Sequence, residues 1–467
     1  MAAALFVTGA VTQAATPFIR LDDFTYMVPE GTTGVPNVWR RNLLEGRWLT
    51  YAWWFVIGQH GTPLSASIMY VTAYVLLVAG LWRVLHLGLP DLHWGVDALL
   101  GLSLFVSPIW VMLFYWPATL TPSTVVGATA LWLLPLAARR HAWLVVWMVA
   151  SALLSVLTYP PVAVVLFLAA VVYLARRPWR DSFWLTGAFL GGFALGVGII
   201  YTLNLLAFDR FGLEVSAWRR PNPLQDLSDL RVNAGRFRLH MGALVTGLWL
   251  PALVGLAAVL AGLLDRVVRP RVVRLLCGLA VVLGVSLAQV LVTGVVTDTR
   301  GELWAWLAVL FPAALLLGGS RTSRLTGLGC IILLTVVGVL AWRSEMVAHQ
   351  KTRAQYAAIV AEATQPRPDG SRPTVVIYQD PELRPTVRGT TMAGIMRMHL
   401  RSELGTVPSW CAGIQCERLA KAAESVAAEV PAGGGEPTET PEQADRFVVE
   451  LGDVRGVVVP PLPPWWL

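Results

Sequence analysis

Residues 142–175 read "AWLVVWMVASALLSVLTYPPVAVVLFLAAVVYLA", and this stretch decides the class of fold. It carries no charge, and pairs of arginines flank it at 139–140 and 176–177. About 20 apolar residues suffice for a helix to cross a bilayer. The stretch is long enough for two such helices, and the "YPP" at 159–161 separates them. It therefore predicts a pair of membrane helices whose arginine-bearing ends lie on the same side of the membrane.

The composition of the whole chain agrees with this reading. Of 467 residues, 55% are hydrophobic and only 14% are charged, with a mean hydropathy of +0.60. Soluble domains carry about 25% charged residues, so the chain is expected to be a polytopic membrane protein. The net charge is +7, but the arginines are scattered in short loops between apolar runs. This pattern records membrane topology and excludes a nucleic-acid partner.

Apolar runs of suitable length predict about eleven membrane helices. They are expected at 2–18, 63–82, 95–115, 120–138, 142–158, 161–175, 182–207, 239–263, 275–297, 303–319 and 325–343. The first run lacks the basic residues that begin a secretory signal, so we interpret it as a membrane helix and not as a cleaved leader.

The loops between these runs predict the orientation of the chain. One alternating set is short and rich in arginine, which is typical of cytoplasmic loops. The other set contains the two long loops, 19–62 and 208–238, which are then external. The N-terminus is expected in the cytoplasm, and the odd number of spans places the C-terminus outside.

The composition changes after Arg343. Residues 1–343 form the predicted membrane domain, and 344–467 a small α/β domain outside the cytoplasm. The tail contains a strand-like "TVVIY" at 374–378, helix-like stretches near 390–404 and 414–428, a Gly/Pro/Glu-rich loop at 431–443, and a second strand-like pattern at 446–459.

Two of the four cysteines, Cys411 and Cys416, lie in this tail in "WCAGIQC". Their spacing favours a local disulfide, which suits an oxidising compartment outside the cytoplasm. Free thiols are the alternative, and a metal site would need further ligands that the neighbouring sequence does not offer.

An acidic pair, Asp22 and Asp23, follows the first apolar run in "FIRLDDFTY". Carboxylates are costly beside hydrocarbon, so the pair is either a solvated helix end or a site. Arginines and aromatic residues follow in the same loop, in "WRR" at 39–41 and "EGRW" at 45–48. Guanidinium groups bind phosphate oxygens bidentately, and a carboxylate can deprotonate an attacking hydroxyl. The combination suits a sugar phosphate.

The placement of this pair, in a long external loop after the first membrane helix, resembles the glycosyltransferase C superfamily. Members are polytopic enzymes that use polyprenyl-phosphate sugars. "LDDFTY" at 21–26 and "LEGRWLTYAW" at 44–53 are similar to the bacterial Gtr-type membrane glucosyltransferases, as is the tyrosine-containing turn in "LSVLTYPPVAVVLFL" at 154–168.

The resemblance implies an inverting transfer of a sugar from a polyprenyl-phosphate donor to an envelope glycan on the outer face of the bacterial plasma membrane. Asp22 or Asp23 would be the general base. The leaving phosphate needs cations, and the candidates on the external loops are Arg41, Arg47, Arg219, Arg220, Arg236 and Arg300. Candidate substrate-binding residues are Trp48, Tyr159 and His240. The donor sugar stays open among glucose, mannose, galactose and arabinofuranose.

Several alternatives remain open at this stage. A divalent cation, Mg²⁺ or Mn²⁺, would suit the acidic pair with help from Asp298 and Glu302, although superfamily members differ in metal use. A transporter or flippase of envelope lipids is a rival function, but the spans hold few ionisable residues. A non-catalytic envelope assembly protein is a second rival.

Overall fold

The computed structural model describes Asp23, Tyr26 and residues 38–57, 63–89, 92–215, 219–382, 387–429 and 446–460. They form two compact units. The first consists of residues 39–57 and 64–343, and the second contains Asp23, Tyr26 and the described residues after Arg343. The predicted span at 2–18 and the predicted loop at 431–443 lie outside the described residues.

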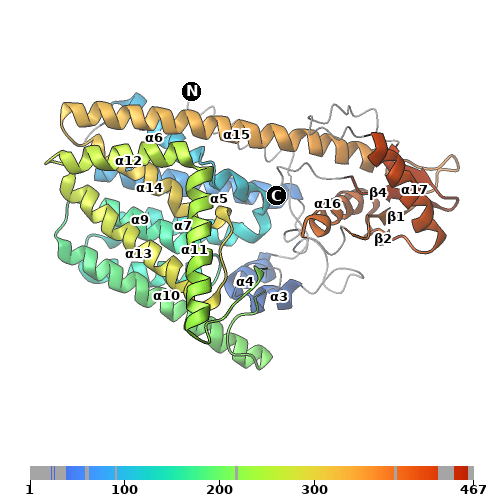
Figure 1. Ribbon diagram of the computed structural model, residues 1–467, viewed down its shortest axis with the longest axis horizontal. Coiled ribbons are helices and arrows are strands. Elements are labelled where there is room, and N and C mark those ends of the chain that lie inside the picture. The colour runs from blue at the N-terminus through green and yellow to red at the C-terminus, as the bar shows by residue number, and fades with distance from the viewer. Residues whose placement is uncertain are drawn as a thin grey trace. The chain divides into compact units, whose positions relative to one another are not determined.

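The first unit is built from helices (Figure 1). In chain order they are α3 (Val38–Leu44), α4 (Trp48–Ile57), α5 (Pro63–Gly88), α6 (Trp94–Phe105), the 3-10 helix η2 (Trp110–Tyr115), α7 (Pro117–Ala137), α8 (His141–Val156), α9 (Pro161–Tyr173), α10 (Trp179–Phe208), α11 (Leu227–Gly247), α12 (Trp249–Leu264), α13 (Arg269–Thr293), the 3-10 helix η4 (Thr299–Gly301), α14 (Leu303–Leu316) and the first part of α15 (Arg321–Thr364).

Five helices of the described chain are long and apolar enough to cross a bilayer, namely α5, α7, α10, α13 and the first part of α15. The pair α11–α12 makes a sixth candidate if it is counted as one bent span. The chain is thus a multi-pass membrane protein. The predicted spans at 95–115, 142–158, 161–175 and 303–319 coincide with apolar helices of only 10–17 residues. The number of about eleven is therefore confirmed only in part.

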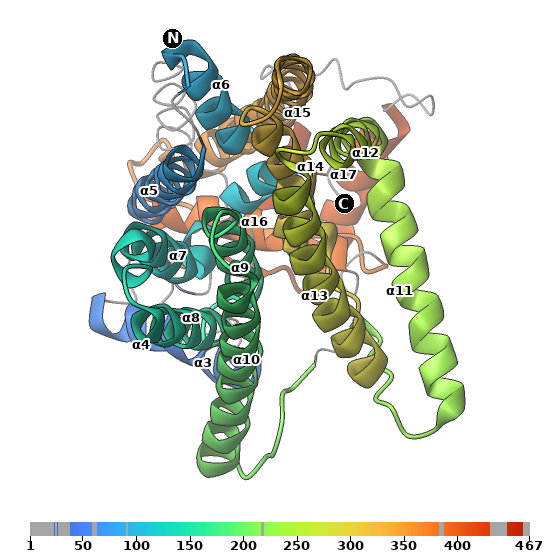
Figure 2. The same cartoon turned by 90° about the vertical axis from the view of Figure 1, so that its left-hand side faces the viewer.

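Helix α9 forms the core of the first unit. Residues 162–172 are all buried, because this helix is apolar on every side. Figure 2 shows it between α7 and α8 on one side and α13 and α14 on the other. Gly192 and Gly196 of α10 lie against α8, where a Cβ at Gly192 would come within 2.7 Å of the Val149 carbonyl oxygen. Small residues at this spacing let two membrane helices approach closely.

The predicted helix 95–115 is interrupted. Helix α6 ends at Phe105 and η2 starts at Trp110, with Pro108 between them, because proline lacks the N–H that an α-helix needs. Carbonyl groups released at the end of α6 find side-chain donors. Tyr74 Oη donates to Phe105 O over 2.7 Å, and Trp306 Nε1 donates to Ser103 O over 2.9 Å.

The predicted span 239–263 is also wrong in its geometry. Helices α11 and α12 meet at Leu248 with a bend of 91°, so residues 239–247 run across the direction of α12 (Figure 1). Pro251 lies in the first turn of α12, where the missing N–H costs nothing. The two long loops are partly helical as well, since α3 and α4 lie within 19–62 and α11 begins at Leu227.

The second unit contains a small mixed sheet with helices, as predicted for the tail in outline. Its elements are the end of α15, β1 (Thr374–Tyr378), α16 (Val387–Leu404), β2 (Ser409–Trp410), α17 (Ile414–Glu429), β3 (Val448–Glu450) and β4 (Val454–Val458). The strand order is β2-β1-β4-β3, with β1 parallel to β2 and β4, and β3 antiparallel to β4.

The strand-like pattern at 446–459 is a hairpin and not one strand. Gly452 in its turn has a φ of +83°, which glycine adopts without strain. Arg455 of β4 is buried, and its Nη1 donates to the carbonyl oxygens of Glu362 (3.0 Å) and Gln365 (2.9 Å) at the end of α15. A disulfide joins Cys411 and Cys416 after β2. Through Arg455, strand β4 therefore binds the carbonyl groups at the end of α15.

Candidate functional site

The turn between α3 and α4 presents Arg47. Gly46 in this turn has a φ of +89°, and a Cβ there would lie 2.9 Å from Leu213 Cδ2. Arg47 Nη2 lies 3.3 Å from Glu45 Oε2, and the backbone N–H of Arg47 donates to Asn42 O over 2.9 Å. Both the conformation and the close packing require glycine, so Gly46 sets the position of Arg47.

Asn204, which is fully buried near the end of α10, anchors this turn. Its Oδ1 accepts a hydrogen bond from Trp48 Nε1 over 2.9 Å. Its Nδ2 donates to the carbonyl oxygens of Leu44 (3.2 Å) and Gly212 (2.7 Å). The indole N–H of Trp48 is therefore engaged within the protein, and the turn that carries Arg47 is held against α10.

The turn between α8 and α9 places Tyr159 at the same end of the bundle. Burial raises the pKa of the Tyr159 phenol to about 12. The positive charges of Arg300 and Arg47 oppose this rise in pKa. The negative charges of Asp298 and Glu302 add to it. A neutral phenol thus lies within the fields of two guanidinium groups and two carboxylates, all on turns that we call the loop face (residues 42–48, 157–161 and 294–302).

Arg300 on η4 is held from two sides. Its Nη2 lies 2.8 Å from Asp298 Oδ2, and its guanidinium carbon lies 3.8 Å from the centre of the Trp116 ring, which is cation–π geometry. A Cβ at the neighbouring Gly301 would lie 3.6 Å from Tyr159 Oη. A guanidinium has five N–H donors, more than the two oxygens of one carboxylate can occupy, so Arg300 retains capacity for a further anion.

A histidine–carboxylate pair joins α11 to the start of α14. His240 Nε2 lies 3.0 Å from Glu302 Oε1, and both side chains are largely buried. Trp304 Nε1 donates to Glu302 Oε2 over 2.5 Å. Each oxygen of this carboxylate therefore has a nitrogen partner, and the pair fixes α11 to the loop face.

The polar stripe of α11 faces the bundle. Asn233 Nδ2 donates to Leu291 O over 3.1 Å near the end of α13. Arg236 Nη1 donates to the carbonyl oxygens of Arg220 (2.7 Å) and Gly294 (3.0 Å). Arg219 and Arg220 are exposed. Arg236 thus holds the backbone of the preceding loop in place, and it is less suited than Arg300 to bind a phosphate.

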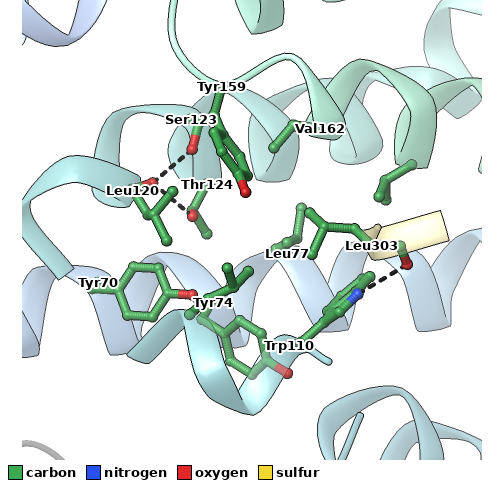
Figure 3. A pocket seen from close by; sticks show the side chains of 12 residues that line it. Tyr70, Tyr74, Leu77, Trp110, Leu120, Ser123, Thr124, Tyr159, Val162 and Leu303 are labelled. Atoms are coloured by element: carbon green, nitrogen blue, oxygen red, sulfur yellow. Dashed lines mark hydrogen bonds between the residues drawn. The ribbon is translucent and has the colours of Figure 1, made fainter. Parts of the chain in front are cut away.

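A small cavity lies among the aromatic side chains next to the loop face, and the Tyr159 hydroxyl points into it (Figure 3). Tyr70, Tyr74 and Trp110 line it from the opposite side. The volume open to the centre of a water molecule is about 20 Å³, so the cavity has room for roughly one water. This cavity is therefore too small to hold a sugar or a prenyl chain.

The acidic pair is only partly described. Asp23 is fully buried and belongs to the second unit, while Asp22 lies outside the described residues. The side chain of Arg41 is outside them too.

Six of the predicted site residues lie on the loop face or are linked to it. Arg47, Trp48, Tyr159 and Arg300 lie on it, Arg236 bonds to Gly294 O and His240 contacts Glu302. The role of Trp116 as a platform for Arg300 was not predicted, because a tryptophan before a proline at a helix end reads as an interfacial anchor.

The sequence suggests Asp298 and Glu302 only as metal ligands, whereas in the structure they pair with Arg300 and His240. Among the described residues, no three His, Cys, Asp or Glu side chains are grouped so that they could hold a metal ion.

Comparisons of the chain with models of protein families, with curated proteins and with solved structures found no match.

Proposed function

We propose that the protein is an integral-membrane glycosyltransferase that moves a sugar from a polyprenyl-phosphate donor to an envelope glycan, at the outer face of the bacterial plasma membrane. The observation that carries the proposal is the convergence of Arg47 and Arg300 around Tyr159, supplied by three turns far apart in the sequence. The motifs around Asp22 and Asp23 supply the candidate base.

In the proposed reaction the acceptor hydroxyl oxygen attacks the anomeric carbon and forms the new glycosidic bond. The hydroxyl proton passes to the carboxylate of Asp22 or Asp23. The bond between the anomeric carbon and the phosphate oxygen breaks, and polyprenyl phosphate leaves with the electron pair. Arg300 and Arg47 stabilise the negative charge that develops on that oxygen.

Arg300 suits this role because Trp116 and Asp298 hold it in one orientation before any ligand arrives. Such a preorganised cation needs no rearrangement during the reaction. The neutral Tyr159 phenol beside it can donate a hydrogen bond to a phosphate oxygen or a sugar hydroxyl.

The test is sugar transfer by the purified full chain in detergent, with a panel of polyprenyl-phosphate sugars and an envelope-glycan extract. We expect wild-type transfer that is abolished in Asp22→Asn or in Asp23→Asn. Asp209→Asn is the matched control, because Asp209 is an exposed acid after α10 with a left-handed φ of 53° that asparagine tolerates. Transfer at the wild-type rate by both acidic-pair variants would refute the proposed base.

A further inference from the structure

The end of the bundle opposite the loop face holds a cluster of arginines that includes one buried residue. Here α9 ends, α10 starts at Trp179 and α13 starts at Arg269, and Figure 2 shows these helices side by side. Arg274 is only 4% exposed. Its Nη1 donates to Leu174 O and its Nη2 donates to Arg177 O over 2.6 Å, while its guanidinium lies 4.7 Å from the centre of the Trp179 ring.

Two N–H groups in this cluster have no acceptor among the described residues. They are Nε of Arg274 and Nη1 of Arg271, and both atoms are buried. A buried donor without an acceptor is costly, and more so if it is charged. Arg176 lies close enough to Arg271 to repel its charge. The positive end of the α13 dipole adds to the same field.

Two carboxylates, Asp181 and Asp265, lie at this end of the bundle, and the charge of Asp181 acts on Arg274. Both carboxylates also have other partners. Asp181 lies 3.5 Å from His141 Nδ1 and 3.9 Å from Arg177 Nη1. Asp265 accepts hydrogen bonds from Ser323 Oγ (2.5 Å) and from the backbone N–H groups of two further residues, Ser320 and Val267. Exposed arginines in short loops are explained by the arginine-rich cytoplasmic loops that orient membrane proteins. That explanation does not cover guanidinium nitrogens that are buried without acceptors.

We propose that Arg176, Arg271 and Arg274 form a phosphate-binding site, and that the phosphate belongs to the headgroup of an anionic lipid. The charge calls for an anion, and bidentate guanidinium geometry suits phosphate oxygens. The lipid source follows from the surroundings: Trp179, Phe183 and Trp184 on α10 are 40%, 72% and 53% exposed. Exposed aromatic residues next to arginines are typical of the headgroup level of a membrane.

The test uses the purified full chain in dodecyl maltoside. Native mass spectrometry measures the binding of dioleoyl phosphatidylglycerol and of dioleoyl phosphatidylcholine, which share their acyl chains and differ in net charge. We expect the wild type to bind one phosphatidylglycerol tightly. Arg271→Gln should weaken this binding roughly tenfold, the loss of about one charge-assisted hydrogen bond. Arg139→Gln, at an exposed arginine outside the cluster, is the matched control.

A second arm separates the two sources of phosphate. The thermal stability of each variant is measured in sodium phosphate and in sodium chloride of equal ionic strength. An Arg271-dependent rise in Tm with inorganic phosphate, without preferential lipid binding, would keep the phosphate site but overturn the lipid assignment. Equal binding of both lipids and no response to phosphate would overturn the whole proposal, as would identical behaviour of Arg271→Gln and Arg139→Gln. None of these outcomes depends on transferase activity.

Discussion

The replacement Asn204→Leu tests whether one buried amide holds the loop face together. Leucine has the same branching as asparagine but no polar atoms. Its two methyl groups are bulkier than the amide oxygen and nitrogen, so some overpacking adds to the loss of the hydrogen bonds. The replacement removes three hydrogen bonds: the one accepted from Trp48 Nε1 and the two donated to the carbonyl oxygens of Leu44 and Gly212.

The expected cost follows from these bonds. An intramolecular hydrogen bond contributes about 0.5–1.5 kcal/mol net, and a buried partner left unpaired costs somewhat more. Three bonds at a fully buried position therefore predict a loss of about 3 kcal/mol in the free energy of unfolding. Arg47 lies on the turn that Asn204 anchors, so the same variant should raise the KM for a polyprenyl-phosphate donor if the proposed function is right.

The free energy of unfolding is measured by tryptophan fluorescence during titration of mixed micelles with a denaturing detergent. Thr202→Val is the control, because Thr202 on the same helix is exposed and its hydroxyl donates to Gly198 O within the helix. Its expected cost is within about 0.5 kcal/mol. The double variant with Trp48→Phe should lose less than the sum of the two single losses. A loss for Asn204→Leu no larger than that for Thr202→Val would refute the reasoning.

Three further predictions concern titration and the tail. In the wild type, stability should fall as the pH rises from about 10 toward 12, because the folded Tyr159 phenol keeps its proton up to a pKa of about 12. Absorbance titration of Tyr159→Phe should lack the phenolate that forms near pH 12. Thermal unfolding of this variant should show a smaller fall with pH and not a complete loss of it, because burial also raises the pKa of Tyr356. Hydrogen bonds from Ser323 and the backbone hold the pKa of Asp265 well below its usual 3.8. The ionised Asp265 carboxylate therefore stabilises the fold fully above pH 3.8, and this stabilisation is lost as the pH falls through the lowered pKa. Asp265→Asn should therefore be less stable than wild type at neutral pH and should show a shallower acid limb in thermal unfolding. Cys411→Ser removes the disulfide between residues five positions apart and should destabilise the second unit by about 2 kcal/mol. The expected readout is faster proteolytic cleavage after β2 in the full chain.

The helical membrane unit and the mixed tail could be predicted from hydropathy and strand-like patterns. The separation of α8 and α9 at "YPP" is a case in point, because proline and a polar turn interrupt an otherwise uniform apolar run. The bend at Leu248 could not be predicted in this way. An apolar run has the same composition in a straight membrane helix and in a pair of helices that meet at 91°. The direction of α11 depends on long-range contacts, because Asn233, Arg236 and His240 bond to partners on α13 and the loop face.

The site was predictable in its chemistry more than in its contacts. Counting spans placed Arg47, Tyr159 and Arg300 on one face, since alternate loops share a side. The partners of these residues depend on tertiary packing: Trp48 and Asn204 are 156 positions apart, and no local pattern reports such a pair.

Arg455 and the rest of β4 are made late in synthesis, although the sheet needs them at its centre. Strand β4 is last in sequence, yet it lies between β1 and β3 in the sheet, and its Arg455 closes the final turn of α15, about 90 positions earlier. During synthesis, therefore, the place beside β1 stays empty until β4, 80 positions after β1, has been made. A chain that ends before Val454 lacks β4, so β1 keeps an open parallel edge, the kind of edge that other chains join.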